Sequence, residues 1–313
     1  MPMSVKHLNL RDLTYVCTVA EHLSFGKAAT LCAISQPAMS SRIQHIEEQL
    51  ACRIFERSKR SVLITEKGHQ IVILARSILD TAESIDQLTR HETKPLTGEL
   101  KIGIISTLGP YLMPLVLGSL AKNFPDLDLQ LTEGLTENLL NSLIAGSLDI
   151  VIATKPVANH TLYCVDLFFE PFMLAAPKNH PLIASQPIAS SQLNGADMIL
   201  LEEGHCLSGQ ALSVCPAEKR RAEKRLHATS LETLRHMIAT GKNYSLLPYL
   251  AVGKNPPLQS LIDYLPLADN SLGRTIVLCS RKSTGRKADC EELTKLIRRH
   301  LPKELTIPSA DQT

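Results

Sequence analysis

Three features of the sequence predict a winged helix-turn-helix domain, a long helix and a two-lobed α/β domain, in that order. Residues 1–66 contain short amphipathic segments that begin with helix-capping serines. A single helical periodicity then runs for roughly 25 residues. From residue 96 to 302, short apolar strands alternate with helices, the pattern of an α/β domain. We therefore expect a winged helix-turn-helix domain at 1–66, a linker helix at 67–95, a two-lobed α/β domain at 96–302 and a tail at 303–313.

Composition places the chain among globular proteins of two or three domains. It has 313 residues, of which 44% are hydrophobic and 20% charged, and its net charge of +2 gives no strong electrostatic signature. The N-terminus lacks a basic-then-apolar signal sequence, and no apolar run reaches the roughly 18 residues of a membrane span. We expect a cytoplasmic protein that does not contact membranes, in which the eight cysteines are mostly reduced.

The N-terminal segments fit a helix-turn-helix. Apolar residues recur at helical spacing over 8–22, and Ser24 can cap a second, short helix over 25–32. Ser35 is a suitable N-cap for a third helix, with Pro37 in its first turn, where the missing N–H does no harm. The residues expected on the buried face of the third helix are Ala38, Ile43, Ile46 and Leu50.

The start of the third helix is polar, short or donor-rich, which suits contacts with base edges and phosphates in a major groove. The hairpin predicted over 53–65 adds a wing with a basic tip that would reach flanking phosphates or the minor groove. A small helical domain with a solvated basic hairpin is the alternative reading. The predicted DNA-contacting residues are Ser35, Gln36, Pro37, Ser40, Ser41 and Arg42 in the helix, and Arg57, Lys59 and Arg60 in the wing.

The long helix carries a narrow apolar stripe. Residues at a and d positions are apolar, with Thr81 as the weak place. Such a stripe has no domain of its own to bury it, so we expect it to pair with the same helix of a second chain. The residues of this stripe are Ile71, Leu74, Ile78, Ile85 and Leu88.

The most informative segment of the α/β domain holds two thiols. An apolar run at 198–201 predicts a strand that delivers His205 and Cys206 to the start of a short helix. Unpaired N–H groups and the positive dipole end there favour a thiolate. Cys215 follows nine residues later, and an intact helix would hold the two thiols beyond the roughly 7 Å that a disulfide tolerates. Oxidation would require remodelling. Two buried cysteines beside a surface histidine are the alternative.

Further polar residues also follow predicted strands. Ser106, Thr107 and Thr136 do so, as does the His205–Cys206 pair, and ligands of open α/β folds bind at such strand ends. We expect these residues to converge on one cleft. No cofactor or metal is predicted, because His227 and the thiol segment fit no standard metal spacing and the chain has no C-x-x-C pair.

Four stretches of the chain resemble the LysR-type transcriptional regulators, and three of them resemble the members that sense hydrogen peroxide. The resemblance extends to about residue 302 and implies a periplasmic-binding-protein-like regulatory domain. It also implies a transcriptional activator of oxidative-stress genes, not an enzyme. The stretches are SFGKAATLCAISQPAMSSRIQHIEEQL at 24–50, STLGPYLMP at 106–114, LEEGHCLSGQALSVC at 201–215 and ATSLETLRHMIATG at 228–241.

The same resemblance assigns roles to individual residues. Cys206 would be oxidised to a sulfenic acid that Cys215 converts into a reversible disulfide. Thr107, Thr136 and His205, with Cys206, would bind the peroxide, and Arg274 would favour the thiolate. The implied partners are promoter DNA, hydrogen peroxide, RNA polymerase, a cellular thiol reductant and further copies of the chain, assembled as a homotetramer.

Two rival functions remain open from the sequence. A LysR-type regulator that senses a small metabolite would use the same cleft without thiol chemistry, and a thiol peroxidase would be an enzyme. Two features lie beyond the resemblance. Six further cysteines could add chemistry of their own, and a basic run after Cys215 is either a solvated face or an influence on how easily the thiol segment refolds. The basic run is Lys219, Arg220, Arg221, Lys224 and Arg225, and the cysteines are Cys17, Cys32, Cys52, Cys164, Cys279 and Cys290.

Overall fold

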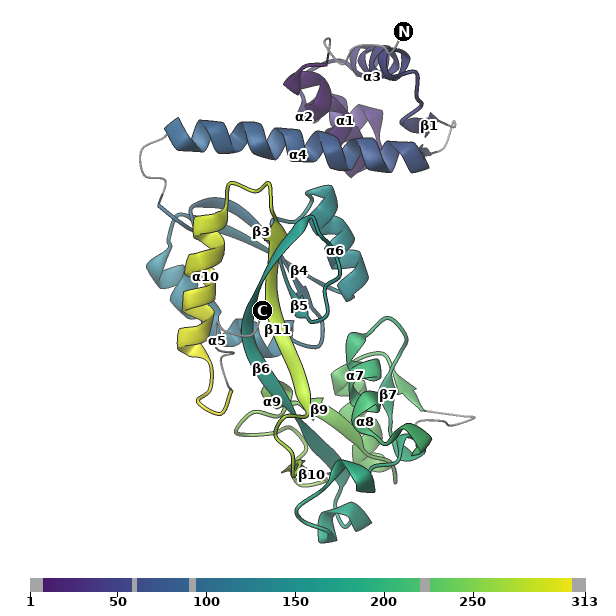
Figure 1. The fold of residues 1–313 in the computed structure, drawn as a ribbon, viewed down its shortest axis with the longest axis vertical. Coiled ribbons are helices and arrows are strands. Elements are labelled where there is room, and N and C mark those ends of the chain that lie inside the picture. The colour runs from purple at the N-terminus through teal and green to yellow at the C-terminus, as the bar shows by residue number, and fades with distance from the viewer. Residues whose placement is uncertain (1–7, 58–60, 90–93, 220–225, 306–313) are drawn as a thin grey trace. The chain divides into compact units, whose positions relative to one another are not determined.

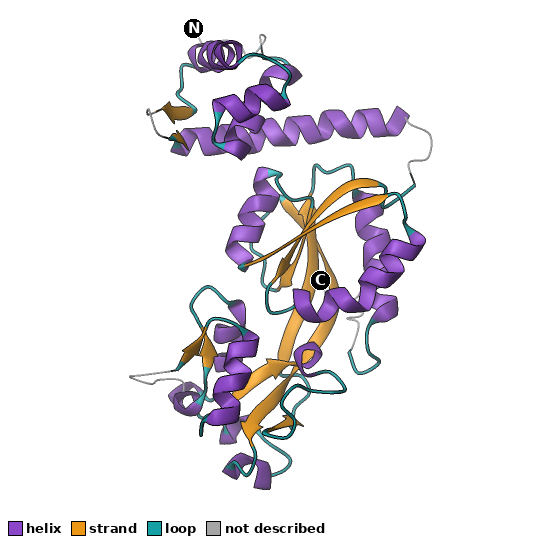
Figure 2. Cartoon of the chain, turned by 180° about the vertical axis from the view of Figure 1, so that it is seen from behind, coloured by secondary structure: helices purple, strands orange, loops and turns teal. Residues whose placement is uncertain are grey.

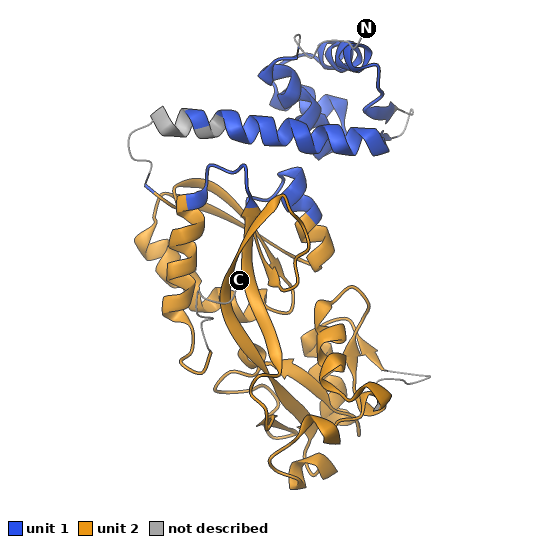
Figure 3. Ribbon diagram, viewed as in Figure 1, with its two compact units in different colours: residues 1–94, 141–149, 281–287 blue, residues 95–140, 150–280, 288–313 orange. Residues whose placement is uncertain are grey.

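The computed structural model describes residues 8–57, 61–89, 94–219 and 226–305. The chain forms two compact units (Figure 3). Unit 1 comprises residues 1–94, 141–149 and 281–287, and unit 2 comprises residues 95–140, 150–280 and 288–313. Together the units confirm the predicted fold class, a winged helix-turn-helix with a long helix followed by an α/β domain.

Unit 1 begins with the helix-turn-helix. The helix caps are those that the sequence predicts: the Ser24 side chain accepts a hydrogen bond from the Lys27 N–H, and Ser35 accepts one from the Ala38 N–H. A short antiparallel hairpin, in which Phe55 pairs with Ile64, forms the wing. The elements are α1 (Leu10–His22), α2 (Phe25–Leu31), α3 (Gln36–Leu50), β1 (Phe55–Arg57), β2 (Val62–Ile64) and α4 (Glu66–Thr89).

The buried face of α3 differs by one position from the prediction. Met39 is fully buried with Ile43 and Ile46, whereas Ala38 is exposed. The helix starts at Gln36, and its contacts with α1 and α2 select the i, i+4, i+7 series that begins at Met39. The expectation for Ala38 was therefore wrong, and the larger side chain fills the core instead.

The long helix α4 packs on α1 and leaves part of its surface exposed. Val72 and Ala75 are buried against the helix-turn-helix. Leu74, Ile78 and Ile85 are 64%, 49% and 62% exposed, respectively. The apolar stripe predicted for pairing is thus uncovered in the single chain at these three positions. Within the described residues, no helix is long and apolar enough to cross a membrane.

Unit 2 is built on a curved mixed sheet flanked by helices (Figures 1 and 2). Its strands follow the order β10-β6-β11-β5-β3-β4, with β9 also paired to β6, and β7 and β8 form a separate parallel pair. The strands are β3 (Gly98–Ile105), β4 (Leu127–Gly134), β5 (Ile150–Thr154), β6 (Leu162–Pro177), β7 (Leu200–Leu201), β8 (His227–Ala228), β9 (Ser245–Pro248), β10 (Ile262–Pro266) and β11 (Gly273–Arg281).

The helices lie close to the positions that the apolar periodicity predicts. The sequence places a helix at 231–240, and α8 has the same bounds. The helices of the α/β domain are α5 (Gly109–Asn123), α6 (Thr136–Ala145), α7 (Cys206–Val214), α8 (Leu231–Thr240), α9 (Tyr249–Val252) and α10 (Lys287–His300). Short 3-10 turns lie at Pro181–Ala184, Ser190–Gln192, Gly195–Asp197 and Ala217–Lys219.

Candidate functional site

The turn between β7 and α7 places a thiol at a helix start. Gly204 has φ +96°, a backbone conformation that favours glycine, and its Cα faces the end of the Leu135 side chain. His205 is the N-cap of α7 and Cys206 is its first helical residue. Cys206 is free and exposed, and it lies beside the unpaired N–H groups of the first turn.

A hydroxyl from another helix meets this thiol. Thr136 is the first residue of α6, directly after β4, and its Oγ1 lies 3.1 Å from the Cys206 Sγ, within hydrogen-bond distance for sulfur. The thiol donates in this geometry. If Cys206 is a thiolate, the Thr136 hydroxyl donates instead and stabilises the negative charge.

A very small cavity of about 10 Å³ lies at this contact. A volume of this size admits about one molecule as large as water. Hydrogen peroxide is only slightly larger, whereas a metabolite with a carbon skeleton would not fit without movement of the walls. The lining residues include each of the predicted peroxide-binding residues, and they are Ile105, Ser106, Thr107, Gly134, Leu135, Thr136, Gly204, His205 and Cys206.

Behind the cavity, Thr107 is held by a buried guanidinium. Arg274 Nη1 donates to the Thr107 Oγ1 over 2.9 Å, and Nη2 donates to the Thr107 carbonyl over 3.1 Å. Arg274 Nε donates to the Glu170 carboxylate over 2.8 Å, and the second oxygen of Glu170 accepts from the Leu250 N–H. Glu170 and Arg274 are 0% and 3% exposed, so their mutual charge compensation matters for folding.

This arrangement refines the role expected of Arg274. Its side chain is bound to Thr107 and Glu170, and the nearby carboxylate offsets its positive charge at the thiol. Orientation of the Thr107 hydroxyl is the role its geometry supports most directly. Sequence reasoning missed Glu170, whose only local signal is a carboxylate within the apolar run LFFEPFML. A buried charge requires a partner, but the sequence does not show which one.

The His205 ring lines the same cavity. Burial lowers the pKa of the imidazole, and the nearby Glu202 carboxylate only partly opposes this shift. A neutral imidazole has one N–H donor and one acceptor. His205 can therefore hydrogen-bond a small polar ligand, and its burial disfavours the charged form of the ring.

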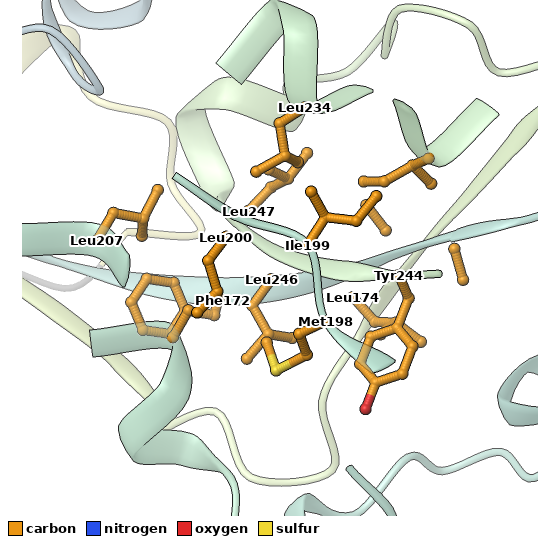
Figure 4. Packing of buried hydrophobic residues seen from close by; sticks show 14 of the residues in the cluster. Phe172, Leu174, Met198, Ile199, Leu200, Leu207, Leu234, Tyr244, Leu246 and Leu247 are labelled. Atoms are coloured by element: carbon orange, nitrogen blue, oxygen red, sulfur yellow. The ribbon is translucent and has the colours of Figure 1, made fainter. Parts of the chain in front are cut away.

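Cys215 lies at the other end of α7, inside the core. It is 1% exposed, and its thiol points to the Met198 sulfur at 3.3 Å. Its cluster includes Met198, Leu200 and Leu207, which are shown packed together in Figure 4. Neither Cys206 nor Cys215 is part of a disulfide in the structure, and α7 separates the two residues by about 13 Å along its axis. A disulfide between them requires this helix to open.

The predicted DNA-contacting residues lie at the start of α3 in unit 1. Ser35, Gln36, Pro37 and Ser41 are exposed. Arg42 is also engaged within the domain, because its guanidinium contacts the Asp12 carboxylate at 2.6 Å, and Asp12 is 1% exposed. Lys59, Arg60 and the side chain of Arg57 fall outside the described residues, as does the basic run from the side chain of Lys219 to Arg225.

Comparisons with known proteins match both parts of the chain. Residues 10–69 match the bacterial regulatory helix-turn-helix protein family of lysR type, and residues 93–302 match the LysR substrate binding domain. The hydrogen peroxide-inducible genes activator of Dickeya chrysanthemi is 36% identical over 94% of this chain and 96% of that protein. The DNA-binding transcriptional dual regulator OxyR of Escherichia coli K12 is 36% identical over 93% of this chain and 95% of its own.

A solved structure agrees with these matches. Full-length OxyR from Pseudomonas aeruginosa, in a variant form, superposes with a TM-score of 0.85 at 35% identity, covering 93% of this chain and 98% of that one. The matched domains and the identity over nearly the whole length of these relatives show that the chain belongs to the LysR family of DNA-binding transcriptional regulators.

Proposed function

We propose that this regulator responds to hydrogen peroxide through Cys206 and Cys215, and that it activates genes for defence against oxidants. The observation that carries the proposal is the cavity of about 10 Å³ at Cys206. It is lined by an exposed thiol at a helix start and by the Thr107 and Thr136 side chains. The Dickeya chrysanthemi relative is named as an activator of hydrogen peroxide-inducible genes, which supports the same conclusion.

Oxidation of the two thiols by peroxide proceeds in two steps. The Cys206 thiolate attacks one peroxide oxygen, the O–O bond breaks, and the products are a sulfenic acid and hydroxide. Hydroxyls of Thr107 and Thr136 can orient the peroxide and stabilise the departing oxygen. The Cys215 thiol then attacks the sulfenic sulfur, which forms the disulfide and releases water. Two electrons have passed from the two thiols to one peroxide, and a cellular thiol reductant returns them.

The second step explains how a local oxidation changes the domain. Cys215 must leave its core position beside Met198, and α7 must open, before the sulfurs can meet. The disulfide therefore stabilises a different arrangement of residues 204–216. We propose that this rearrangement changes the spacing of DNA-binding domains in a dimer paired through α4 and in a tetramer. Promoter DNA and RNA polymerase are the partners of the activated form, in the cytoplasm.

Mass spectrometry after one equivalent of hydrogen peroxide tests the proposal. The wild-type chain should give a linked Cys206–Cys215 peptide, and dithiothreitol should remove it. Cys215→Ser should stop at a sulfenic acid on Cys206 that dimedone traps, while Cys206→Ser should give neither product. Absence of any dimedone adduct at Cys206 in Cys215→Ser would remove this cysteine from the reaction.

The small-metabolite alternative makes the opposite prediction. A metabolite sensor should keep its thiol count after peroxide treatment and should still change its DNA affinity with its ligand. The narrow cavity disfavours this alternative at the thiol site. Membership in a family of transcription regulators disfavours the thiol peroxidase, and a lack of sustained peroxide consumption by the isolated protein would confirm that judgement.

A further inference from the structure

A second pair of cysteines lies on neighbouring strands of unit 2. Cys164 on β6 and Cys279 on β11 are 115 residues apart in sequence, yet their Cα atoms are separated by 4.1 Å and a disulfide joins them. The two strands run side by side (Figure 1). Their antiparallel register also brings Gly273 against Glu170, so sheet pairing alone sets the two thiols opposite each other.

This pair differs from Cys206 and Cys215 in the movement that oxidation requires. The thiols of α7 meet only if a helix opens, whereas Cys164 and Cys279 are within bonding reach in the intact sheet. Their Cα separation is near that of directly opposite, non-hydrogen-bonded residues in antiparallel strands. Forming or breaking this bond therefore needs no change of fold.

The two sulfurs differ in how accessible they are to external thiols and disulfides. Cys279 is 0% exposed and pairs with Val151 of β5 on its other side, so external reagents do not reach it in the folded sheet. Cys164 is only half-buried, near the start of β6. An external thiol or disulfide can therefore approach this bond from the Cys164 side.

We propose that Cys164 and Cys279 form a second, reversible redox pair that exchanges with low-molecular-weight disulfides of the glutathione type. The Cys164 thiolate attacks one sulfur of the external disulfide and releases one thiolate. Cys279, after losing its proton, attacks the Cys164 sulfur of this mixed disulfide and releases the second. Two protein thiols are oxidised and one external disulfide is reduced to two thiols. In a reducing compartment such a bond reports the thiol–disulfide balance.

The pair also has a structural consequence for the peroxide site. Glu170 lies on β6 and Arg274 on β11, the same two strands that the bond crosslinks. Oxidation should fix the register on which this charged pair depends, without opening α7. We expect it to raise the melting temperature of the chain by roughly 5–15 °C, mainly by restricting the unfolded state.

The full-length Cys206→Ser chain lacks the proposed peroxide-reactive thiol, so it can report on the Cys164–Cys279 pair alone. The substituted side chain is exposed, so the fold should be unaffected. We would equilibrate it with graded ratios of oxidised to reduced glutathione, block free thiols with N-ethylmaleimide and map the peptides. The linked Cys164–Cys279 peptide should increase with the oxidised share and disappear in excess reduced glutathione under native conditions. Alkylation of both cysteines at every ratio, or a linkage that survives reduced glutathione, would overturn the proposal.

A matched pair of variants supplies the second measurement. Cys164→Ser should abolish the difference in melting temperature between glutathione-oxidised and glutathione-reduced protein. Cys52→Ser, at a half-buried free thiol in unit 1, should preserve that difference. Persistence of the full difference in Cys164→Ser would assign the stabilisation to other thiols. Neither readout depends on DNA binding or on peroxide, so failure here leaves the proposed function untouched.

Discussion

Thr107 illustrates how one residue joins folding to chemistry. It is buried, it lines the cavity at Cys206, and its hydroxyl accepts from Arg274, which leaves its own proton free to point to a ligand oxygen. Thr107→Val keeps the shape but removes the hydroxyl. Because one hydrogen bond to the peroxide is lost, we expect stopped-flow oxidation of Cys206 to slow about ten-fold.

Two controls separate this effect from a general loss of thiol reactivity. Thr107→Ser retains the hydroxyl and should stay close to the wild-type rate. Alkylation of Cys206 by iodoacetamide should be unchanged in Thr107→Val, because that reaction does not use the Thr107 hydroxyl. Equal slowing of peroxide oxidation and alkylation would show instead that the substitution alters the thiolate itself.

Arg42 and Gln36 both belong to the helix predicted to contact DNA, but their surroundings in the structure differ. Arg42 compensates the buried Asp12 carboxylate, so Arg42→Ala should lower the stability of the domain as well as its DNA affinity. Gln36→Ala alters an exposed side chain and should weaken operator binding by about 1–3 kcal/mol if it contacts a base. Fluorescence anisotropy with thermal melts can distinguish the two effects. Unchanged operator affinity in Gln36→Ala would remove this residue from the interface.

At the scale of elements, α7 is the part that oxidation should change. Cys206 is the first of its nine residues and Cys215 is its C-cap, so the disulfide cannot form while the helix remains intact. We expect backbone amides of residues 207–214 to lose hydrogen-exchange protection after peroxide treatment, while those of α8 keep it. Exchange followed by mass spectrometry measures this directly. Equal protection of α7 in the dithiol and disulfide forms would contradict the opening of the helix.

Elements with local signals were predictable from the sequence. The capping serines Ser24 and Ser35 set the starts of α2 and α3, because each accepts a hydrogen bond within its own first turn. The apolar run at 198–201 likewise predicts the strand-to-helix junction at Cys206, and the helix expected over 207–214 lies one residue from the observed start of α7. These features depend on residues only a few positions apart, so local sequence patterns are enough to predict them.

Elements that depend on residues far away in the sequence were not predictable from it. The full length of strand β6 is not predictable from its own residues, because Glu170 and Pro171 interrupt its apolar run. Glu170 is tolerated there since Arg274, 104 residues away, neutralises it. The Cys164–Cys279 pair likewise needs the register of β6 and β11, and burial of Met39 needs the packing angle of α3 on its neighbours. None of these partners can be chosen from local pattern alone.

At the scale of the whole molecule, the uncovered stripe of α4 points to assembly. Leu74, Ile78 and Ile85 recur along one side of the helix and remain largely exposed in the single chain. Apolar side chains at this spacing are typical of helices that pair with a second copy. A dimer would hold two reading helices together, so that binding of one half-site raises the effective concentration of the other.

Ile78→Glu tests this assembly. Placing a carboxylate at the middle of the stripe should separate the dimer, because two buried charges would face each other, and operator affinity should fall by roughly 10²–10⁴-fold once the half-sites bind independently. Gln70→Glu adds the same charge at an exposed, already polar position of α4 and should leave the assembly intact. Light scattering measures the mass of the assembly, and fluorescence anisotropy measures its affinity for the operator. If Ile78→Glu retains the mass of the wild-type assembly, the pairing surface lies elsewhere, since a charge at 49% exposed Ile78 does not disturb the core of the single chain.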